Sequence, residues 1–350
     1  MRLLFCLLGA SCVARTPVRR APPPPRIAIV AAEGGAQGAR LVALDEHGDR
    51  QFALMQHPGA VVRDTHPVIS PDGAWIVFAS SRGRALDQTS LWIAPLVADA
   101  VPRRLTEGRA IDSHPVWTRD GGAIVFASTR GGTFDLYRLA IERGVARGAP
   151  EQLTHGAGHE VTPTIAADGT IFYAEVTPRP GGQPESHLEA RAPDGSIRRV
   201  TDGPADASPA LSPDDRTIAF ARPKEHNGAL DGELWMMRRD ASEAMLVIDL
   251  PLTDESGPVW SPDGRFLFAT SVLRGVAGNA VFSSVIVVDT RARRPSARML
   301  EDRLGVIARL TPAIANVRLD AAVLARDPEY LPELARIMAA AIAAQNPEMK

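Results

Sequence analysis

Cysteine is nearly absent from this sequence, and the two that occur, Cys6 and Cys12, lie within the first dozen residues. The rest of the chain has no thiols for a disulfide framework or a cysteine-ligated zinc site. An excess of basic residues is also missing, because 39 Lys and Arg face 41 Asp and Glu. This balance excludes nucleic acid as an expected partner. After the N-terminus, no apolar run approaches the roughly 18 residues of a membrane-spanning helix.

The N-terminus resembles a bacterial lipoprotein signal. Arg2 precedes an apolar run from Leu3 to Leu8, and the sequence GASC then ends at Cys12. We expect residues 1–15 to direct export to the periplasm, and the resemblance implies a lipid on Cys12 that anchors the protein to a membrane. A non-lipid signal and an uncleaved apolar tail are the alternatives. Residues 16–25, TPVRRAPPPP, would hold an extended conformation and space a folded domain from the membrane.

One unit of sequence recurs five times along the chain. The copies start at residues 65, 113, 161, 207 and 256 and read THPVISPDGAWIVFAS, SHPVWTRDGGAIVFAS, VTPTIAADGTIFYAE, ASPALSPDDRTIAFAR and SGPVWSPDGRFLFAT. Their reference prolines, Pro67, Pro115, Pro163, Pro209 and Pro258, are spaced by 48, 48, 46 and 49 residues. A period of about 40 to 50 residues is typical of the blades of a β-propeller.

Each unit predicts four short strands. An aspartate stands five residues after every reference proline, at Asp72, Asp120, Asp168, Asp214 and Asp263. A short carboxylate followed by glycine favours a tight turn, which would join the first strand to the second. The apolar segments after the turn predict second strands buried on both faces, at 75–78, 124–126, 171–173, 218–220 and 266–268. Third strands are predicted at 91–93, 135–137, 187–189, 234–236 and 285–288, and fourth strands at 104–106, 152–154, 199–201, 246–248 and 298–300.

The two ends of the repeat region are complementary. Residues 27–30, 40–44 and 51–54 look like second, third and fourth strands without a first one. Residues 310–315, LTPAIA, repeat the first-strand pattern without a second strand after it. We therefore expect one composite blade that closes the ring and removes its exposed edges. The predicted fold is all-β, a six-bladed β-propeller over residues 26–320 with a composite closing blade.

A short helix is predicted in the C-terminal tail, residues 321–350. Pro332 suits the first turn of a helix. One stripe of this helix would be apolar, and it comprises Leu334, Ile337, Met338, Ala341 and Ile342. Packing against the rim of the propeller is the simpler interpretation, and binding a partner is the alternative.

The repeat resembles that of TolB-like propellers with PD40, or WD40-like, repeats. The motif is carried by Ile69-Ser70-Pro71-Asp72-Gly73 and by Trp260-Ser261-Pro262-Asp263-Gly264, each followed by a β-rich apolar segment. The resemblance covers about residues 26–316 and implies a periplasmic or surface-exposed propeller that binds proteins at its upper face and central channel. The small α/β domain of TolB is not expected here, because the propeller begins directly after the proline-rich stretch.

Peptidase activity is not expected. The repeat also resembles propellers attached to serine peptidases of the prolyl oligopeptidase group, whose hydrolase domain carries a G-x-S-x-G nucleophile elbow. The sequence contains no G-x-S-x-G, and the roughly 35 residues after the last strand are too few for such a domain.

An acid stands three residues before each reference proline, and these candidate binding residues are Asp64, Asp112, Glu160, Asp206 and Glu255. The composite blade has Arg309 there instead. Because first strands line the channel of a propeller, the five carboxylates are expected at one channel mouth. Such a ring would attract a cationic ligand, a basic peptide or Ca²⁺. Alternatively, each acid is a structural latch paired with a repeated basic residue, for which the candidates are Arg82, Arg130 and Lys224.

Histidines near the same mouth raise a metal hypothesis. His66 and His114 occupy equivalent places before their prolines, and His155 and His159 enter the third unit. Similar propellers in oligogalacturonate lyases hold a metal with histidines, which suggests a metal-assisted carbohydrate-active enzyme. The equivalent positions elsewhere, Thr162, Ser208 and Gly257, lack histidine, so ordinary surface or turn histidines are favoured and no metal is assigned. The strand tryptophans are expected in the core between blades, and these are Trp92, Trp117, Trp235 and Trp260.

The sequence favours an exported, monomeric and non-catalytic scaffold without a required cofactor. Its partner would be a protein or peptide of the cell envelope, bound over the channel mouth by the five acids together with His66 and His114. The metal-assisted enzyme is the alternative hypothesis.

Overall fold

The structure, a computed structural model, describes residues 27–35, 38–44, 51–56, 61–203, 205–226, 229–250, 253–274, 280–292, 295–300 and 312–314. The expected export signal with Cys12, the proline-rich stretch, Arg309 and the C-terminal helix all lie outside these residues. Within the described ranges, no helix has the length and hydropathy needed to cross a membrane.

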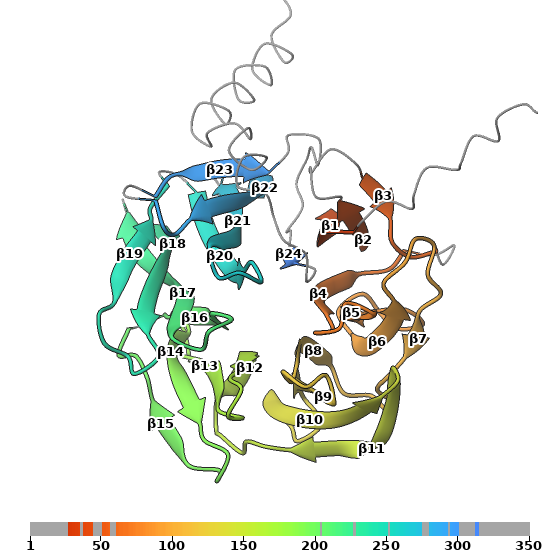
Figure 1. The fold of residues 1–350 in the computed structure, drawn as a ribbon. Helices are drawn as coiled ribbons and strands as arrows, with labels where there is room; N and C mark the ends of the chain where they lie inside the picture. Colours follow the sequence, from red (N-terminus) through yellow and green to blue (C-terminus); the bar gives the residue numbers. More distant parts are fainter. Residues whose placement is uncertain are drawn as a thin grey trace, which may run out of the picture.

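The described residues form four-stranded antiparallel sheets arranged around an axis, as in a β-propeller (Figure 1). Five blades use four consecutive strands, and we number these sheets I to V. Sheet I comprises β4 (Asp64–Ile69), β5 (Trp75–Ser80), β6 (Ser90–Pro95) and β7 (Arg103–Arg104). Sheet II comprises β8 (Asp112–Trp117), β9 (Ala123–Ser128), β10 (Asp135–Glu142) and β11 (Val145–Gln152), and sheet III comprises β12 (His159–Ile165), β13 (Ile171–Thr177), β14 (Glu185–Arg191) and β15 (Ile197–Arg199). Sheet IV comprises β16 (Ala207–Leu211), β17 (Thr217–His226), β18 (Ala229–Arg238) and β19 (Met245–Ile248), and sheet V comprises β20 (Thr253–Trp260), β21 (Phe266–Arg274), β22 (Ala280–Asp289) and β23 (Ala297–Leu300).

The two ends of the chain meet in one further sheet. It comprises β1 (Ile29–Gly35), β2 (Gly38–Leu44), β3 (Gln51–Ala53) and the distant β24 (Pro312–Ile314). Ile29 pairs with Ile314 and Ala31 with Pro312, so the predicted pairing of these segments is observed. β24 also contacts the first strands β4 and β20 on either side of it. The first strands thus contact one another in sequence around the axis.

The first strand of every sheet from I to V bulges at its reference proline. In β4 the pairing with β5 shifts between Thr65 and Val68, and the other four first strands shift at the corresponding place. Proline has no N–H to donate to the neighbouring strand, so the ladder is interrupted there. The residue before each proline adopts a left-handed conformation with φ between 48° and 60°, at His66, His114, Thr162, Ser208 and Gly257.

The turns after the first strands confirm the predicted role of the repeated aspartate. Its Oδ1 accepts a hydrogen bond from the backbone N–H two residues later in all five sheets, as from Ala74 to Asp72 (3.0 Å) and from Gly122 to Asp120 (3.0 Å). In sheets I to III and V a glycine with positive φ follows it, while sheet IV uses Asp215 at φ 60°. These turns fix where each first strand ends.

The hydrophobic core lies between neighbouring sheets. The second strands supply most of it, since β9 is buried at all six of its residues. Each of sheets I to V contributes a fully buried phenylalanine from its second strand, namely Phe78, Phe126, Phe172, Phe220 and Phe268. Trp117 is buried, and Trp92, Trp235 and Trp260 pack partly buried against these clusters, as predicted. The predicted second and third strands match the observed ones.

The fourth strands were predicted slightly too far along the chain in sheets I to III. There β7, β11 and β15 end before the triplets RLT, QLT and RVT are complete. The threonine of each triplet instead accepts a hydrogen bond from a third-strand N–H. Leu91 N donates to Thr106 Oγ1 (2.9 Å), and Thr154 and Thr201 are bound likewise by Leu136 and Leu188.

Removing β24 should destabilise the ring. A chain that ends at residue 309 leaves the edge of β1 unpaired, whereas one that ends at residue 320 keeps the β24 segment. We expect the shorter chain to melt at least about 5 °C below the longer one, measured by circular dichroism. Equal melting temperatures would show that β24 contributes nothing to stability.

Candidate functional site

The five predicted acids lie at or next to the start of the innermost strands, and all five are buried. Asp64 and Asp112 are 1 % exposed, Glu160 is 2 % exposed, and Asp206 and Glu255 are fully buried. They share one end of the axis, which we call the acid-side end, and the aspartate turns lie at the other, the turn-side end. Burial changes what these groups can do, because an unpaired buried charge is costly.

Three of the acids are paired with arginine. Asp64 binds Arg82 (2.7 Å) and Asp112 binds Arg130 (2.7 Å), as the latch interpretation predicts. Asp206 binds Arg222 through both of its oxygens (2.7 and 2.8 Å). The arginines also lie over aromatic rings, as Arg222 does over Trp235 at 5.0 Å. Each pair joins the start of a first strand to the second strand, or to the residues just after it, in the same sheet.

The predicted latch through Lys224 is wrong. Lys224 pairs with Glu233 (3.0 Å) and Asp249 (3.6 Å), and Arg222 takes its place beside Asp206. Arg222 stands sixteen residues after its acid, whereas Arg82 stands eighteen after Asp64. The position sixteen residues on lies directly across the two strands, where Asp64 meets Ser80 (2.5 Å). That geometric position was the signal available in the sequence.

Among the described residues, no arginine forms an ion pair with either of the two glutamates of the series. Glu255 accepts hydrogen bonds from Thr253 (2.6 Å) and Ser271 (2.9 Å), and its Oε2 is buried without a partner among the described residues. Burial raises the pKa of Glu255 from 4.5 to about 8. Burial, followed by a hydrogen bond with Asp135, likewise raises the pKa of Glu160. Both carboxyls are therefore largely protonated at neutral pH.

Two of the residues that precede the reference prolines lie beside each other at the bulges of the innermost strands. His66 and His114, from sheets I and II, place their rings 3.9 Å apart at an angle of 47°. Burial lowers the pKa of His66 to about 4, and burial together with the neighbouring His66 lowers the pKa of His114 well below its ordinary value. Both rings are thus neutral at pH 7. His66 Nδ1 and the equivalent Thr162 Oγ1 are buried and have no hydrogen-bond partner within the described part of the chain.

The other two histidines are not brought into this pair. His155 is exposed, and His159 accepts a hydrogen bond from the N–H of Phe134 (3.2 Å) and packs edge-on against its ring. No group of three or more His, Cys, Asp or Glu side chains in the described ranges is placed to hold a metal ion. The site therefore combines neutral imidazoles and hydroxyls rather than a coordination set.

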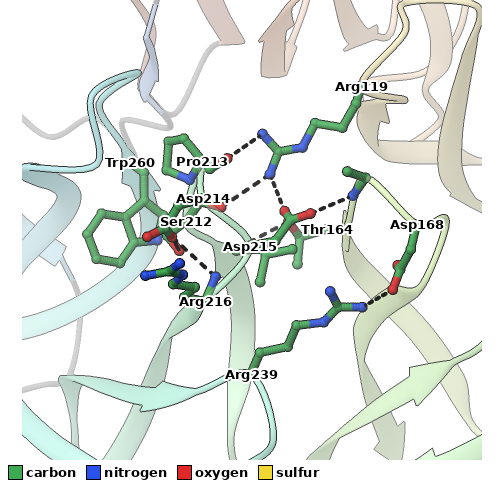
Figure 2. A network of polar contacts seen from close by, with 12 residues as sticks. Arg119, Thr164, Asp168, Ser212, Pro213, Asp214, Asp215, Arg216, Arg239 and Trp260 are labelled. Carbon is green, nitrogen blue, oxygen red and sulfur yellow. Dashed lines mark hydrogen bonds and ion pairs between the residues drawn. The ribbon is translucent and has the colours of Figure 1, made fainter.

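A polar network at the turn-side end was not expected from the sequence (Figure 2). Arg119, in the turn of sheet II, donates to Asp215 Oδ1 (2.5 Å) and to the carbonyl of Ser212 (3.1 Å) in sheet IV. Ala167 N, in the turn of sheet III, donates to Asp215 Oδ2 (2.7 Å). One aspartate thus connects the turns of three sheets. The signal for it lies in departures from the repeat, since Arg119 and Ala167 replace proline and Asp215 replaces glycine.

The comparisons with known proteins agree with this fold. Residues 64–263, more than half of the 350 residues, match the family described as PD40, TolB beta propeller domain. Among solved structures, the chain is similar to a putative TolB from Agrobacterium tumefaciens, with 19% identity, a TM-score of 0.59, and coverage of 79% of this chain and 88% of that one. TolB from Acinetobacter baumannii gives 18% identity and a TM-score of 0.62, covering 83% of this chain and 66% of that one.

Proteins whose names indicate a different function are also similar to the chain in fold. Hydrazine synthase from Kuenenia stuttgartiensis is 14% identical with a TM-score of 0.62, covering 84% of this chain and 48% of that one. No curated protein matches the chain. At identities this low, the structural likeness shows the fold alone.

Breaking one latch should be strongly destabilising. Arg222→Ala leaves the fully buried Asp206 without its partner, and we expect the free energy of unfolding to fall by about 3 kcal/mol in urea denaturation. The control is Arg216→Ala, because Arg216 is exposed and forms no ion pair within the described residues; it should change stability by less than about 0.5 kcal/mol. A loss below about 1 kcal/mol for Arg222→Ala would contradict the latch.

Stability should fall as pH rises, in part because of Glu255. Its pKa is about 8 in the folded chain against an ordinary 4.5, so the unfolded carboxyl loses its proton first. Its contribution to stability is then complete below about pH 4.5, declines as pH rises, and levels off above about pH 8. Glu255→Gln should flatten part of this decline, measured by urea unfolding across that range. The exposed Glu107→Gln is the control, and an unchanged pH slope for Glu255→Gln would count against a protonated Glu255.

Proposed function

Because this chain belongs to the PD40 family of TolB beta propeller domains, we propose that it is an exported, non-catalytic scaffold of the cell envelope. Its partner is a protein or peptide segment bound at the central axis. Export and the envelope location are supported by the TolB proteins to which the fold is similar and by the signal-like N-terminus. Attachment through a lipid on Cys12 and a monomeric state are part of the same proposal.

One observation carries the binding role. The bulge positions of neighbouring innermost strands bring His66 and His114 into contact, and His66 Nδ1 and Thr162 Oγ1 are buried without partners among the described residues. A buried polar atom without a hydrogen bond costs free energy, which a bound segment with its own amide and carbonyl groups can recover. The folded core does not need these side chains, since the bulge of sheet V has only glycine there.

The chemistry of the site favours an uncharged or weakly charged segment. Asp64, Asp112 and Asp206 are neutralised by arginine, and Glu160 and Glu255 have raised pKa values. The two histidines are neutral at pH 7. Attraction of a strongly basic peptide or Ca²⁺ by all five acids is therefore not supported by their environments. We propose that His66 and His114 contact the partner, and that the acids shape the strands from which they project.

We also propose that the propeller is six-bladed, with the composite sheet as its closing blade. The register of β24 against β1, and the contacts of β24 with both β4 and β20, support this count. A closed ring holds the innermost strands at fixed spacing, which a shared binding site along the axis requires.

The metal-assisted carbohydrate-active enzyme stays an alternative hypothesis without a specific observation in its favour. It needs several ligands around one ion, and the described residues gather only the His66 and His114 pair.

Chemical crosslinking in an envelope fraction tests the scaffold. The full chain should recover a crosslinked partner, and the double variant His66→Ala with His114→Ala should lower recovery at least about tenfold, because both rings contact the segment. The control is His155→Ala, since His155 is exposed on a loop away from the pair. Melting temperatures verify that each variant is folded. Equal recovery by the double variant, or no partner recovered by the unaltered chain, would contradict the proposal.

A further inference from the structure

The turn-side end of the axis is built differently over sheets II to IV than elsewhere. Sheets I, IV and V carry proline in the turn after their first strand, at Pro71, Pro213 and Pro262. The same place holds Arg119 in sheet II and Ala167 in sheet III. These two departures, together with Asp215, lie in three consecutive sheets.

Where the proline is kept, neighbouring turns meet through apolar contact. A Cβ built on Gly121 would lie 3.7 Å from Pro71 Cδ, and one on Gly264 would lie 3.5 Å from Pro213 Cδ. Proline of one turn therefore faces glycine of the next. This contact between a proline ring and a glycine is apolar.

Between sheets III and IV the same contact has become polar. Ala167 takes the place of proline and Asp215 that of glycine, and Ala167 N donates to Asp215 Oδ2 at 2.7 Å. A proline could not make this bond, because it has no N–H. Asp215 accepts it in a left-handed conformation, φ 60°, which favours glycine on steric grounds. The N–H that Ala167 offers in place of proline is thus bound by the carboxylate that Asp215 offers in place of glycine.

Arg119 extends the connection across a whole sheet. Its side chain extends from the turn of sheet II, and its guanidinium donates to Asp215 Oδ1 (2.5 Å) and to the carbonyls of Ser212 (3.1 Å) and Pro213 (3.3 Å) in sheet IV (Figure 2). The Asp215 side chain is only 17% exposed, so the ion pair is better shielded than a fully exposed pair. Further out, Arg239 of sheet IV binds Asp168 of sheet III (2.5 Å) and strengthens the same sector.

We propose that Arg119, Ala167 and Asp215 form a clasp over the turn-side end of the axis, which bars this end to a partner segment and leaves the acid-side end as its entry. The inference rests on the proposed binding at the axis and adds a direction to it. Arg119 joins the turns of two sheets that are not neighbours, and at the acid-side end no side chain of the described residues joins non-neighbouring sheets in this way. His66 and His114, at the bulges between the two ends, would then be reached only from the acid side.

Thiol labelling tests the clasp without a partner. The full chain with Cys6→Ser and Cys12→Ser receives one reporter, Thr164→Cys, on the half-buried stretch of β12 beside Asp215 in Figure 2. The reporter is reacted with a small methanethiosulfonate and with a maleimide that carries a polyethylene-glycol chain. The clasp is removed by Asp215→Gly, which restores the repeat residue and so should preserve the fold, and separately by Arg119→Ala.

Removing the clasp should speed labelling by the bulky reagent at least about tenfold, since each lost charge-assisted bond favours opening. The small reagent should react equally in all backgrounds. Arg216→Ala is the matched control for loss of a nearby arginine and should leave both rates unchanged.

A second reporter, Ser256→Cys, lies on β20 near the acid-side end and should be labelled by the bulky reagent with or without the clasp. Equal bulky-reagent rates at Thr164→Cys in all backgrounds would overturn the clasp. Exclusion of that reagent from Ser256→Cys would overturn acid-side entry. Neither result depends on partner recovery, so failure of this inference is distinct from failure of the scaffold proposal.

Discussion

A single missing hydrogen determines the shape of the innermost strands. Each reference proline lacks the N–H that would bind the second strand, so every first strand of sheets I to V bulges there. The bulge places the preceding residue in a left-handed conformation and brings His66 beside His114. The residues before the prolines, which occupy equivalent places in the five first strands, therefore lie at the same level along the axis. The contact between the two imidazole rings thus follows from the N–H that each proline lacks.

The repeat alone was sufficient to predict the sheets. The aspartate turns, the buried second strands and the pairing of residues near 29 with residues near 314 follow from spacing and local turn chemistry. Fourth-strand ends were placed too late because the hydroxyl of Thr106 imitates a ladder bond without being part of the strand. The choice of Arg222 over Lys224 depends on which side chain lies directly across from Asp206 on the second strand. A spacing counted along the chain does not specify that geometry.

The polar network at the turns was beyond sequence reasoning for a different reason. Arg119, Ala167 and Asp215 are separated by about one repeat each, and every one of them looks like ordinary variation within its own turn. Only the closed arrangement of sheets brings the three departures within bonding distance. The acids show a related division: each aspartate forms an ion pair with an arginine, whereas neither glutamate does so among the residues that the structure describes. A longer side chain with a raised pKa thus substitutes for an ion pair at the same structural position.

The threonine that follows the outer strand of sheet I bears on how copies of the protein can associate. Outer strands of a propeller are edge strands, and unpaired amides along an edge can recruit a strand from another chain. In sheet I the outer strand has only two residues, and the Leu91 amide that a longer strand would engage is bound by the Thr106 hydroxyl instead. The chain then leaves for the next sheet before a longer edge can form. A short outer strand offers few backbone groups to a strand of another copy, so this arrangement protects sheet I against edge-to-edge association.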